Sequence, residues 1–252
     1  MFLPRMKILL MLFAFVACTV KLRAQQNLFN IPSGDVIPKK KFFYQHQLNF
    51  YDVNQFETKS HLVYGVGKNW DVGINFLDLP LQIGNDQFLS YNDSSNRKPL
   101  YPILMFTAQK QWTLNHSMQI NAGAQMGSNV SSRVENKQFA FLTYALFKWK
   151  PGKRGYLLAG PYLGNDVFVG GPPEFRPGYM IGYEFKINDR WLLMGDFISG
   201  SHKKSQTVLG GGFNLSDRIQ IFVGALLAYP NTKLQDGLVI EFNWYSWNYK
   251  GH

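Results

Sequence analysis

The sequence contains one cysteine, Cys18, so a fold held together by disulfide bonds is excluded. Charged residues make up only 17% of the chain, whereas 46% of it is hydrophobic and 16% aromatic, which excludes intrinsic disorder. No apolar run reaches the roughly 18 residues that a membrane-spanning helix needs, since the longest clean run is only Ile8 to Ala17. The chain is therefore expected to fold around a sizeable core without disulfides or membrane-spanning helices.

The first 24 residues have the order of a secretory signal peptide. Arg5 and Lys7 precede the apolar run, and Ala24 is a small residue at a plausible cleavage site. A rival interpretation places a lipid on Cys18 instead. We expect residues 1–24 to be removed as a signal peptide, which leaves 228 residues without cysteine and suits export into an oxidising compartment.

Charge gives little support for a nucleic-acid partner. After cleavage the chain carries 22 basic and 16 acidic residues, a net charge of +6. This charge is spread thinly along the sequence, and an exported protein rarely meets nucleic acid. We therefore expect no nucleic-acid partner.

From residue 43 onward, apolar and polar residues alternate in segments about ten residues long. In the segment 218–228, for example, Ile219, Ile221, Val223, Ala225 and Leu227 form one apolar row. Twelve such segments cover residues 43–51, 59–67, 69–78, 101–111, 117–127, 138–149, 154–163, 177–187, 190–200, 206–214, 218–228 and 236–245. A period of two predicts β-strands that each have one apolar face.

The connections between these segments alternate in length. The short ones are 68–69, 113–116, 151–154, 188–189 and 216–217, and the longer ones are 53–58, 80–100, 128–137, 165–176, 201–205 and 229–235. In a soluble sandwich the apolar faces meet in a core, whereas in a membrane barrel they face lipid and short turns alternate with longer loops. The pattern therefore predicts an all-β fold, a closed antiparallel up-and-down transmembrane barrel of about twelve strands.

All six tryptophans fall beside the short connections or at the C-terminus, which an even number of strands brings to the same side. Tryptophan prefers the membrane interface because its ring is apolar while its N–H group needs water. The predicted aromatic girdle consists of Trp70, Trp112, Trp149, Trp191 and Trp244.

The last predicted strand carries a recognisable pattern. Residues 235–242 read QDGLVIEF, a polar residue followed by a glycine and then by alternating apolar or aromatic residues. This resembles the C-terminal insertion signal of Gram-negative outer-membrane β-barrel proteins of the porin type, although that class usually ends on the aromatic residue, whereas this chain continues to His252. The resemblance implies a place in the cell outer membrane, contact with its lipids and folding by the barrel-assembly machinery.

The polar rows opposite the apolar ones supply the predicted lumen wall. This wall includes Asp71, Asn75, Gln119, Asn121, Gln125, Glu184, Lys186, Glu241 and Asn243. A twelve-stranded barrel has a lumen between those of filled small barrels and open porins. Mixed charge with many amides favours a narrow passive channel for small polar solutes. The alternative is that these side chains plug the lumen and leave a structural or surface-interaction barrel.

A second alternative is a lipid hydrolase, because this class includes enzymes with a Ser–His centre. The pairs Ser60–His61 and His116–Ser117 are adjacent in strands, so their side chains point to opposite faces. Ser201–His202 lies in a loop from which Asp196 is within reach. The histidines lack metal-ligand spacing, and no cysteine remains after cleavage. We expect no catalytic residue, no metal and no cofactor.

The sequence also predicts the behaviour of three segments outside the strands. The loop 165–176 is stiffened by two consecutive prolines and is expected either to fold inward as a constriction or to be mobile. The loop 80–100 offers Arg97 and Lys98 to lipid phosphates. Residues 25–42 are expected to form an irregular periplasmic lead-in to a single barrel domain, 43–252.

Overall fold

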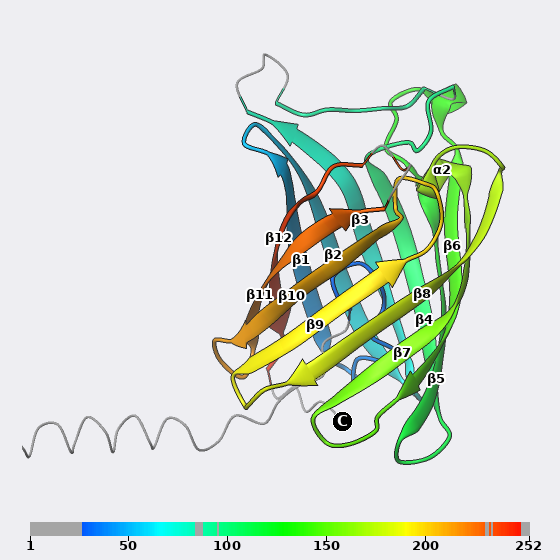
Figure 1. Ribbon diagram of the computed structural model, residues 1–252. Coiled ribbons are helices and arrows are strands. Elements are labelled where there is room, and N and C mark those ends of the chain that lie inside the picture. Colours follow the sequence, from blue (N-terminus) through cyan, green and yellow to red (C-terminus); the bar gives the residue numbers. More distant parts are fainter. Residues whose placement is uncertain (1–26, 84–87, 95, 230–231, 233, 248–252) are drawn as a thin grey trace, which may run out of the picture.

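The computed structural model describes residues 27–83, 88–94, 96–229, 232 and 234–247 (Figure 1). The predicted signal peptide and Cys18 lie outside the described residues. Twelve strands follow one another along the chain: β1 (Phe42–Asp52), β2 (Gln55–Gly67), β3 (Trp70–Gln82), β4 (Ile103–Thr113), β5 (Met118–Asn129), β6 (Phe139–Trp149), β7 (Gly155–Asn165), β8 (Phe175–Lys186), β9 (Trp191–Ile198), β10 (Gln206–Asn214), β11 (Ile219–Ala228) and β12 (Gly237–Tyr245).

The strands form one closed barrel in which every neighbouring pair is antiparallel. β1 pairs with β2 on one side and closes the barrel on β12 on the other, with Phe43 opposite Tyr245. The prediction of a closed up-and-down barrel of twelve strands is confirmed. The two helices are short, η1 (Val134–Asn136) and α2 (Asp166–Val169). Neither helix among the described residues is long and apolar enough to cross a membrane.

The apolar rows face outward. In β11 the even-numbered residues are mostly buried, whereas Ile221, Val223 and Leu227 are 38–46% exposed on the outside. β8 shows the same alternation. Tyr179, Ile181 and Phe185 are exposed on the outside, whereas Met180 and Glu184 are buried on the inside. An apolar outer band around a closed sheet is the surface that lipid covers, because every backbone group of the wall is already paired within the barrel.

The connections at the two ends of the barrel differ in length, with one exception. One end, which we call the short-turn end, has the connections 68–69, 114–117, 150–154, 187–190 and 215–218. The other end, which we call the long-loop end, includes the connections 83–102, 130–138, 166–174, 199–205 and 229–236. The predicted loop 53–58 is wrong, because β1 and β2 are joined by Val53 and Asn54 alone. The strands continue further than expected because Phe56 stacks on Phe50 across the hairpin, with ring centroids 5.6 Å apart.

The segment predicted as a periplasmic lead-in lies elsewhere. Its described part, Asn27–Lys41, is irregular as expected, but it loops inside the barrel before entering β1 (Figure 1). Leu28, Phe29 and Ile31 are almost completely buried there, within the same apolar cluster as side chains of the wall. We call Asn27–Lys41 the N-terminal segment. It turns the lumen from a water-filled pore into a partly filled interior.

Candidate functional site: the barrel lumen

Most of the predicted lumen-lining residues are enclosed within the barrel. Asp71, Asn75, Asn121, Glu184, Glu241 and Asn243 are each at most 3% exposed. Gln125 lines an internal cavity, and Gln119 and Lys186 are half-buried towards the short-turn end. The side chains do not line an open pore, since several bond to one another or to the N-terminal segment. Their part in conduction stays a prediction.

Charged wall residues hold the backbone of the N-terminal segment. Asp196 of β9 accepts hydrogen bonds from the backbone N–H groups of Asn30 (2.6 Å) and Ile31 (3.4 Å). Asp71 of β3 accepts another from Ile37, at 2.9 Å. These buried carboxylates therefore have donors supplied by the irregular backbone of the N-terminal segment.

One ion pair fixes the segment close to the short-turn end. The ammonium of Lys148, on β6, lies 2.5 Å from Oδ2 of Asp35 and 3.6 Å from the centroid of the Tyr156 ring. Lys148 is fully buried, so its charge has left water and depends on this pairing. A buried charge is tolerated only when it is paired in this way.

Glycines in the wall make room for the apolar side chains of the segment. A Cβ atom on Gly182 of β8 would lie 2.3 Å from Cδ1 of Leu28. A Cβ atom on Gly224 of β11 would lie 2.9 Å from Cζ of Phe29. Both distances are shorter than any real contact, so larger residues at these positions would force Leu28 and Phe29 out of their present positions.

From the long-loop end, α2 folds into the barrel, which is one of the two alternatives that the sequence left open for the loop 165–176. Its side chains Val167, Phe168 and Val169 are buried, and the Lys98 ammonium pairs with Asp166 at 2.7 Å. This ion pair ties two loops together, and contact of Lys98 with lipid phosphates stays a prediction. The lumen is thus entered by a separate segment from each end.

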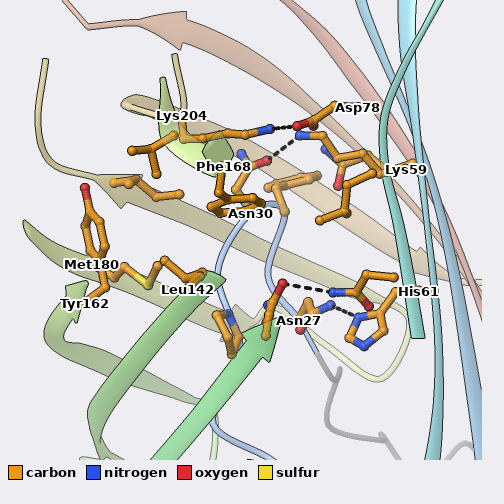
Figure 2. Close-up of a pocket in the computed structure, with 18 of the residues that line it drawn as sticks. Asn27, Asn30, Lys59, His61, Asp78, Leu142, Tyr162, Phe168, Met180 and Lys204 are labelled. Carbon is orange, nitrogen blue, oxygen red and sulfur yellow. Dashed lines mark hydrogen bonds and ion pairs between the residues drawn. The ribbon is translucent and has the colours of Figure 1, made fainter. Parts of the chain in front are cut away.

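Between the two segments lies an inner cavity of about 100 Å³ (Figure 2). One side of it is polar and comes from β1, β2 and β3. Asn27 Nδ2 donates to Oε1 of Gln45 and contacts Nδ1 of His61, both at 2.7 Å. Because an amide nitrogen only donates, Nδ1 of His61 accepts, and the hydrogen of the neutral ring lies on Nε2. That buried Nε2 has no hydrogen-bond partner among the described residues.

The opposite side of the inner cavity is apolar. Figure 2 shows Leu142, Tyr162 and Met180 across the cavity from His61 and Lys59. Phe168 and Val169 of α2 and Ile198 of β9 complete this side. The cavity therefore suits a molecule with one apolar face and one face that forms hydrogen bonds.

A wider vestibule of about 340 Å³ opens towards the long-loop end. Lys59, Asp78, Lys204 and Gln206 line both the vestibule and the inner cavity. Lys204 from the loop 199–205 pairs with Asp78 of β3 across the boundary, as Figure 2 shows, and Lys59 Nζ lies 3.3 Å from Oε1 of Glu57. Two cations and two anions thus form a balanced group between the two spaces.

The predicted girdle lies at the short-turn end. Trp70, Trp112, Trp149 and Trp191 are 40–52% exposed on the outer wall, and Trp244 is half-buried. The first four stand at the ends of their strands next to short turns, and Trp244 stands near the end of the last strand at the same end of the barrel. The positions are those expected for side chains at one edge of an apolar band.

No assembled hydrolase centre is found among the described histidines. His202 is buried, and burial lowers its pKa to about 4, with Arg176 and Lys204 adding to the effect. Its Nδ1 accepts from the backbone N–H of Lys204, and its Nε2 contacts the Tyr162 hydroxyl at 2.6 Å. The ring therefore holds the loop 199–205 in place and does not approach Asp196, which is bonded to the N-terminal segment.

One serine hydroxyl does contact a histidine ring in the described part of the chain. Ser60 Oγ lies 2.9 Å from Nδ1 of His46, across the β1–β2 hairpin on the outward face. No described carboxylate or amide side chain bonds the other ring nitrogen of His46, so the orienting group of a catalytic triad is missing. Nor do three His, Cys, Asp or Glu side chains gather as a metal site among the described residues.

The sequence did not reveal the residues of the N-terminal segment as part of the site. Leu28, Phe29 and Ile31 stand too close together to show a strand or helix period. Asn27 and Asn30 look like ordinary loop residues beside Pro32. The available signal was indirect: a cluster of apolar residues in an otherwise polar lead-in needs a place to be buried.

Comparisons with known proteins give the fold and nothing finer. No family model matches the chain, and no curated protein matches it. A solved outer-membrane channel from Pseudomonas putida F1 is similar over 85% of this chain and 98% of its own, with 12% identity and a TM-score of 0.52.

Two further solved structures are less similar to this chain. The toluene transporter TbuX of Ralstonia pickettii shares 10% identity over 82% of this chain and 90% of its own, with a TM-score of 0.47. The KdgM porin shares 7% identity over 81% of this chain and 98% of its own, with a TM-score of 0.48. The closed twelve-stranded topology and the similarity to the Pseudomonas putida channel show that the chain has the closed β-barrel fold of outer-membrane channels.

Proposed function

We propose that the protein is an outer-membrane channel that its own N-terminal segment closes, and that it admits small, uncharged, amphipathic solutes. The observation that carries this proposal is the inner cavity, which shares four lining residues with the vestibule on one side and ends against the N-terminal segment on the other. In this arrangement the short turns face the periplasm. Recognition of residues 235–242 by the barrel-assembly machinery stays a prediction.

Two features of the cavity favour an uncharged solute over the broadly polar one expected from sequence. Lys59 and Lys204 already have acidic partners, so neither offers a free charge to an anion. The Nε2–H group of His61 and Oδ1 of Asn75 are a buried donor and a buried acceptor without partners among the described residues. A solute with one hydroxyl or carbonyl group and an apolar body satisfies them while covering Met180 and Leu142.

Passage requires the N-terminal segment to leave its hollow in the wall. The variant Gly182→Leu places a side chain where Leu28 now lies and should release the segment. In planar bilayers we expect rare, brief openings for the unmodified protein and frequent conductance steps for Gly182→Leu. Equal behaviour of the two proteins would contradict closure by the segment, and complete silence of both would favour the structural barrel.

A matched control is available on the other face of the sheet. Gly211 of β10 faces outward, where an added Cβ atom would lie 3.1 Å from the backbone oxygen of Leu192 and 3.7 Å from Leu193. Gly211→Leu therefore adds the same side chain on the lipid side. It should leave the conductance of the unmodified protein unchanged.

Two probes with the same ring test the solute class. Cyclohexanol is uncharged, and cyclohexanecarboxylate is its charged counterpart. A ligand that binds only the folded state raises the unfolding midpoint, so cyclohexanol should stabilise the protein more than the carboxylate does. His61→Phe removes the N–H donor and should abolish this difference. A larger shift with the carboxylate would contradict the uncharged solute class.

A further inference from the structure

Charge is distributed unevenly between the two ends of the barrel. Outside the lumen, ten basic residues lie at the short-turn end, which we call the basic rim: Lys39, Lys40, Lys41, Lys68, Lys110, Lys150, Lys153, Arg154, Arg190 and Arg218. Outside the lumen, that end carries only two described acidic residues, Asp189 and Asp217. The excess positive charge of the protein is therefore concentrated at one end.

The long-loop end is nearly neutral by comparison. Its described loops and strand ends carry seven basic residues, Arg97, Lys98, Arg133, Lys137, Arg176, Lys203 and Lys204, and six acidic residues, Asp52, Asp93, Glu135, Asp166, Glu174 and Asp236. The basic rim is thus a property of one end and not of the whole surface.

The cations of the basic rim have no acidic partners in the described part of the chain. The four ion pairs found there join Lys59 to Glu57, Lys98 to Asp166, Lys148 to Asp35 and Lys204 to Asp78. None of them includes a residue of the rim. Ten like charges around one ring repel each other unless something outside the protein supplies the opposite charge.

Two cations of the rim are positioned by tryptophan rings on the outer wall. Lys110 lies opposite Trp70 in the sheet, and its Nζ is 5.0 Å from the centroid of that ring and 5.4 Å from that of Trp112. The Arg218 guanidinium is 3.4 Å from the Trp247 centroid and 5.4 Å from that of Trp244. Cation–π contacts of this kind hold both charges at the edge of the apolar band.

We propose that the basic rim binds the anionic headgroups of phospholipids in the membrane leaflet that surrounds the short-turn end, with Lys110 and Arg218 contacting the lipid phosphates. The cations at the tryptophan pairs are continuous with the lipid-covered outer wall, so a headgroup reaches them while its acyl chains lie against the apolar band. An acidic protein in solution would meet the exposed turns, such as Lys153 and Arg154, before it met Lys110. The leaflet is the periplasmic one under the orientation proposed above.

The test uses the full barrel in an uncharged detergent, titrated with short-chain phosphatidylglycerol or with phosphatidylcholine of the same chain length. Binding is followed by tryptophan fluorescence, since the proposed sites contain four tryptophans. We expect phosphatidylglycerol to bind more tightly, and added salt to weaken it. The double variant Lys110→Gln/Arg218→Gln should lose about 25-fold in phosphatidylglycerol affinity, at about fivefold per cation near an anionic surface.

Controls separate this proposal from general charge effects and from misfolding. Lys137→Gln/Arg97→Gln removes the same two residue types from exposed positions at the long-loop end and should keep the affinity of the unmodified protein. Lys153→Gln/Arg154→Gln removes two exposed rim charges without touching a tryptophan contact and should show a smaller loss. Equal affinity for the two lipids, or an equal loss in the long-loop control, would overturn the proposal.

A competitor distinguishes lipid from protein as the partner. An oligoglutamate peptide should not displace phosphatidylglycerol from the unmodified protein. Displacement at equal peptide and lipid concentrations would overturn the proposal in favour of an acidic protein partner. Failure here leaves the bilayer conductance experiments unaffected, so the two proposals fail independently.

Discussion

The two halves of the lumen wall hold the same N-terminal segment in different ways. The half built by β1, β2 and β3 offers polar side chains, of which Gln45, His61 and Asp71 contact Asn27 and Ile37. The half from β6 to β11 is largely apolar and is hollowed by glycines that admit Leu28 and Phe29. Apolar burial provides adhesion without direction, whereas hydrogen bonds and ion pairs fix position. The half from β6 to β11 therefore supplies most of the adhesion, and it shares the alignment with the polar half through Asp196 and Lys148.

The largest effect is expected from the apolar half. Phe29→Ala removes a buried ring that packs edge-on against Phe222, with centroids 6.4 Å apart. Loss of a buried phenylalanine costs about 3–5 kcal/mol, so docking of the segment should fail in this variant. Protease cleavage within residues 27–41, followed by mass spectrometry, measures the release. Phe139→Ala, on the lipid-facing side, should leave the segment protected; cleavage at the same rate in both variants would refute the distinction.

The second-largest effect is expected from the ion pair between Lys148 of β6 and Asp35. Lys148→Met leaves Asp35 without its partner, and breaking a buried pair costs about 3 kcal/mol or more. The unfolding midpoint should fall, and the added variant Asp35→Asn should recover much of the loss by removing the orphaned charge. A matched change at the neighbouring turn, Lys150→Met, should have little effect. No recovery in the double variant would show that Lys148 acts through packing on Tyr156 alone.

A smaller effect is expected from the polar half. Asn27→Ala removes the two side-chain contacts to Gln45 and His61, each worth about 1 kcal/mol in net stability. The segment should stay docked, because Phe29 and Leu28 still anchor it, but cyclohexanol binding should weaken as His61 loses its fixed orientation. A release of the segment as large as in Phe29→Ala would contradict the division of roles between the two halves.

The smallest effect concerns pH and the loop 199–205. Burial lowers the pKa of His202 from an ordinary value of 6.5 to about 4, so the unfolded chain takes up this proton first as the pH falls. The contribution of neutral His202 is fully present above pH 6.5 and is lost as the pH falls towards 4. In the His202→Gln variant, the unfolding midpoint should depend less on pH between these two values. An unchanged pH profile would show that another group governs this range.

The outer surface was predictable from sequence because lipid imposes a strict period of two on residues such as Ile221, Val223 and Ala225. The apolar half of the lumen was not, because β6 is apolar on both faces: Leu142 and Leu146 point inward while Phe141 and Phe147 point outward. Such a strand has no alternation to read. The N-terminal segment was misplaced for a related reason, since its burial depends on glycines that lie some 150–200 residues away in the sequence.

One measurement tests closure by the N-terminal segment most directly. Leu28 and Gly182 lie in contact, and the one cysteine of the sequence, Cys18, belongs to the predicted signal peptide, so Leu28→Cys/Gly182→Cys introduces a single disulfide between segment and wall. Bilayer current is recorded with the bond formed and again after a reductant is added. The account predicts silence in the oxidised state and conductance steps after reduction. Equal conductance in both states would show that the segment does not close the channel.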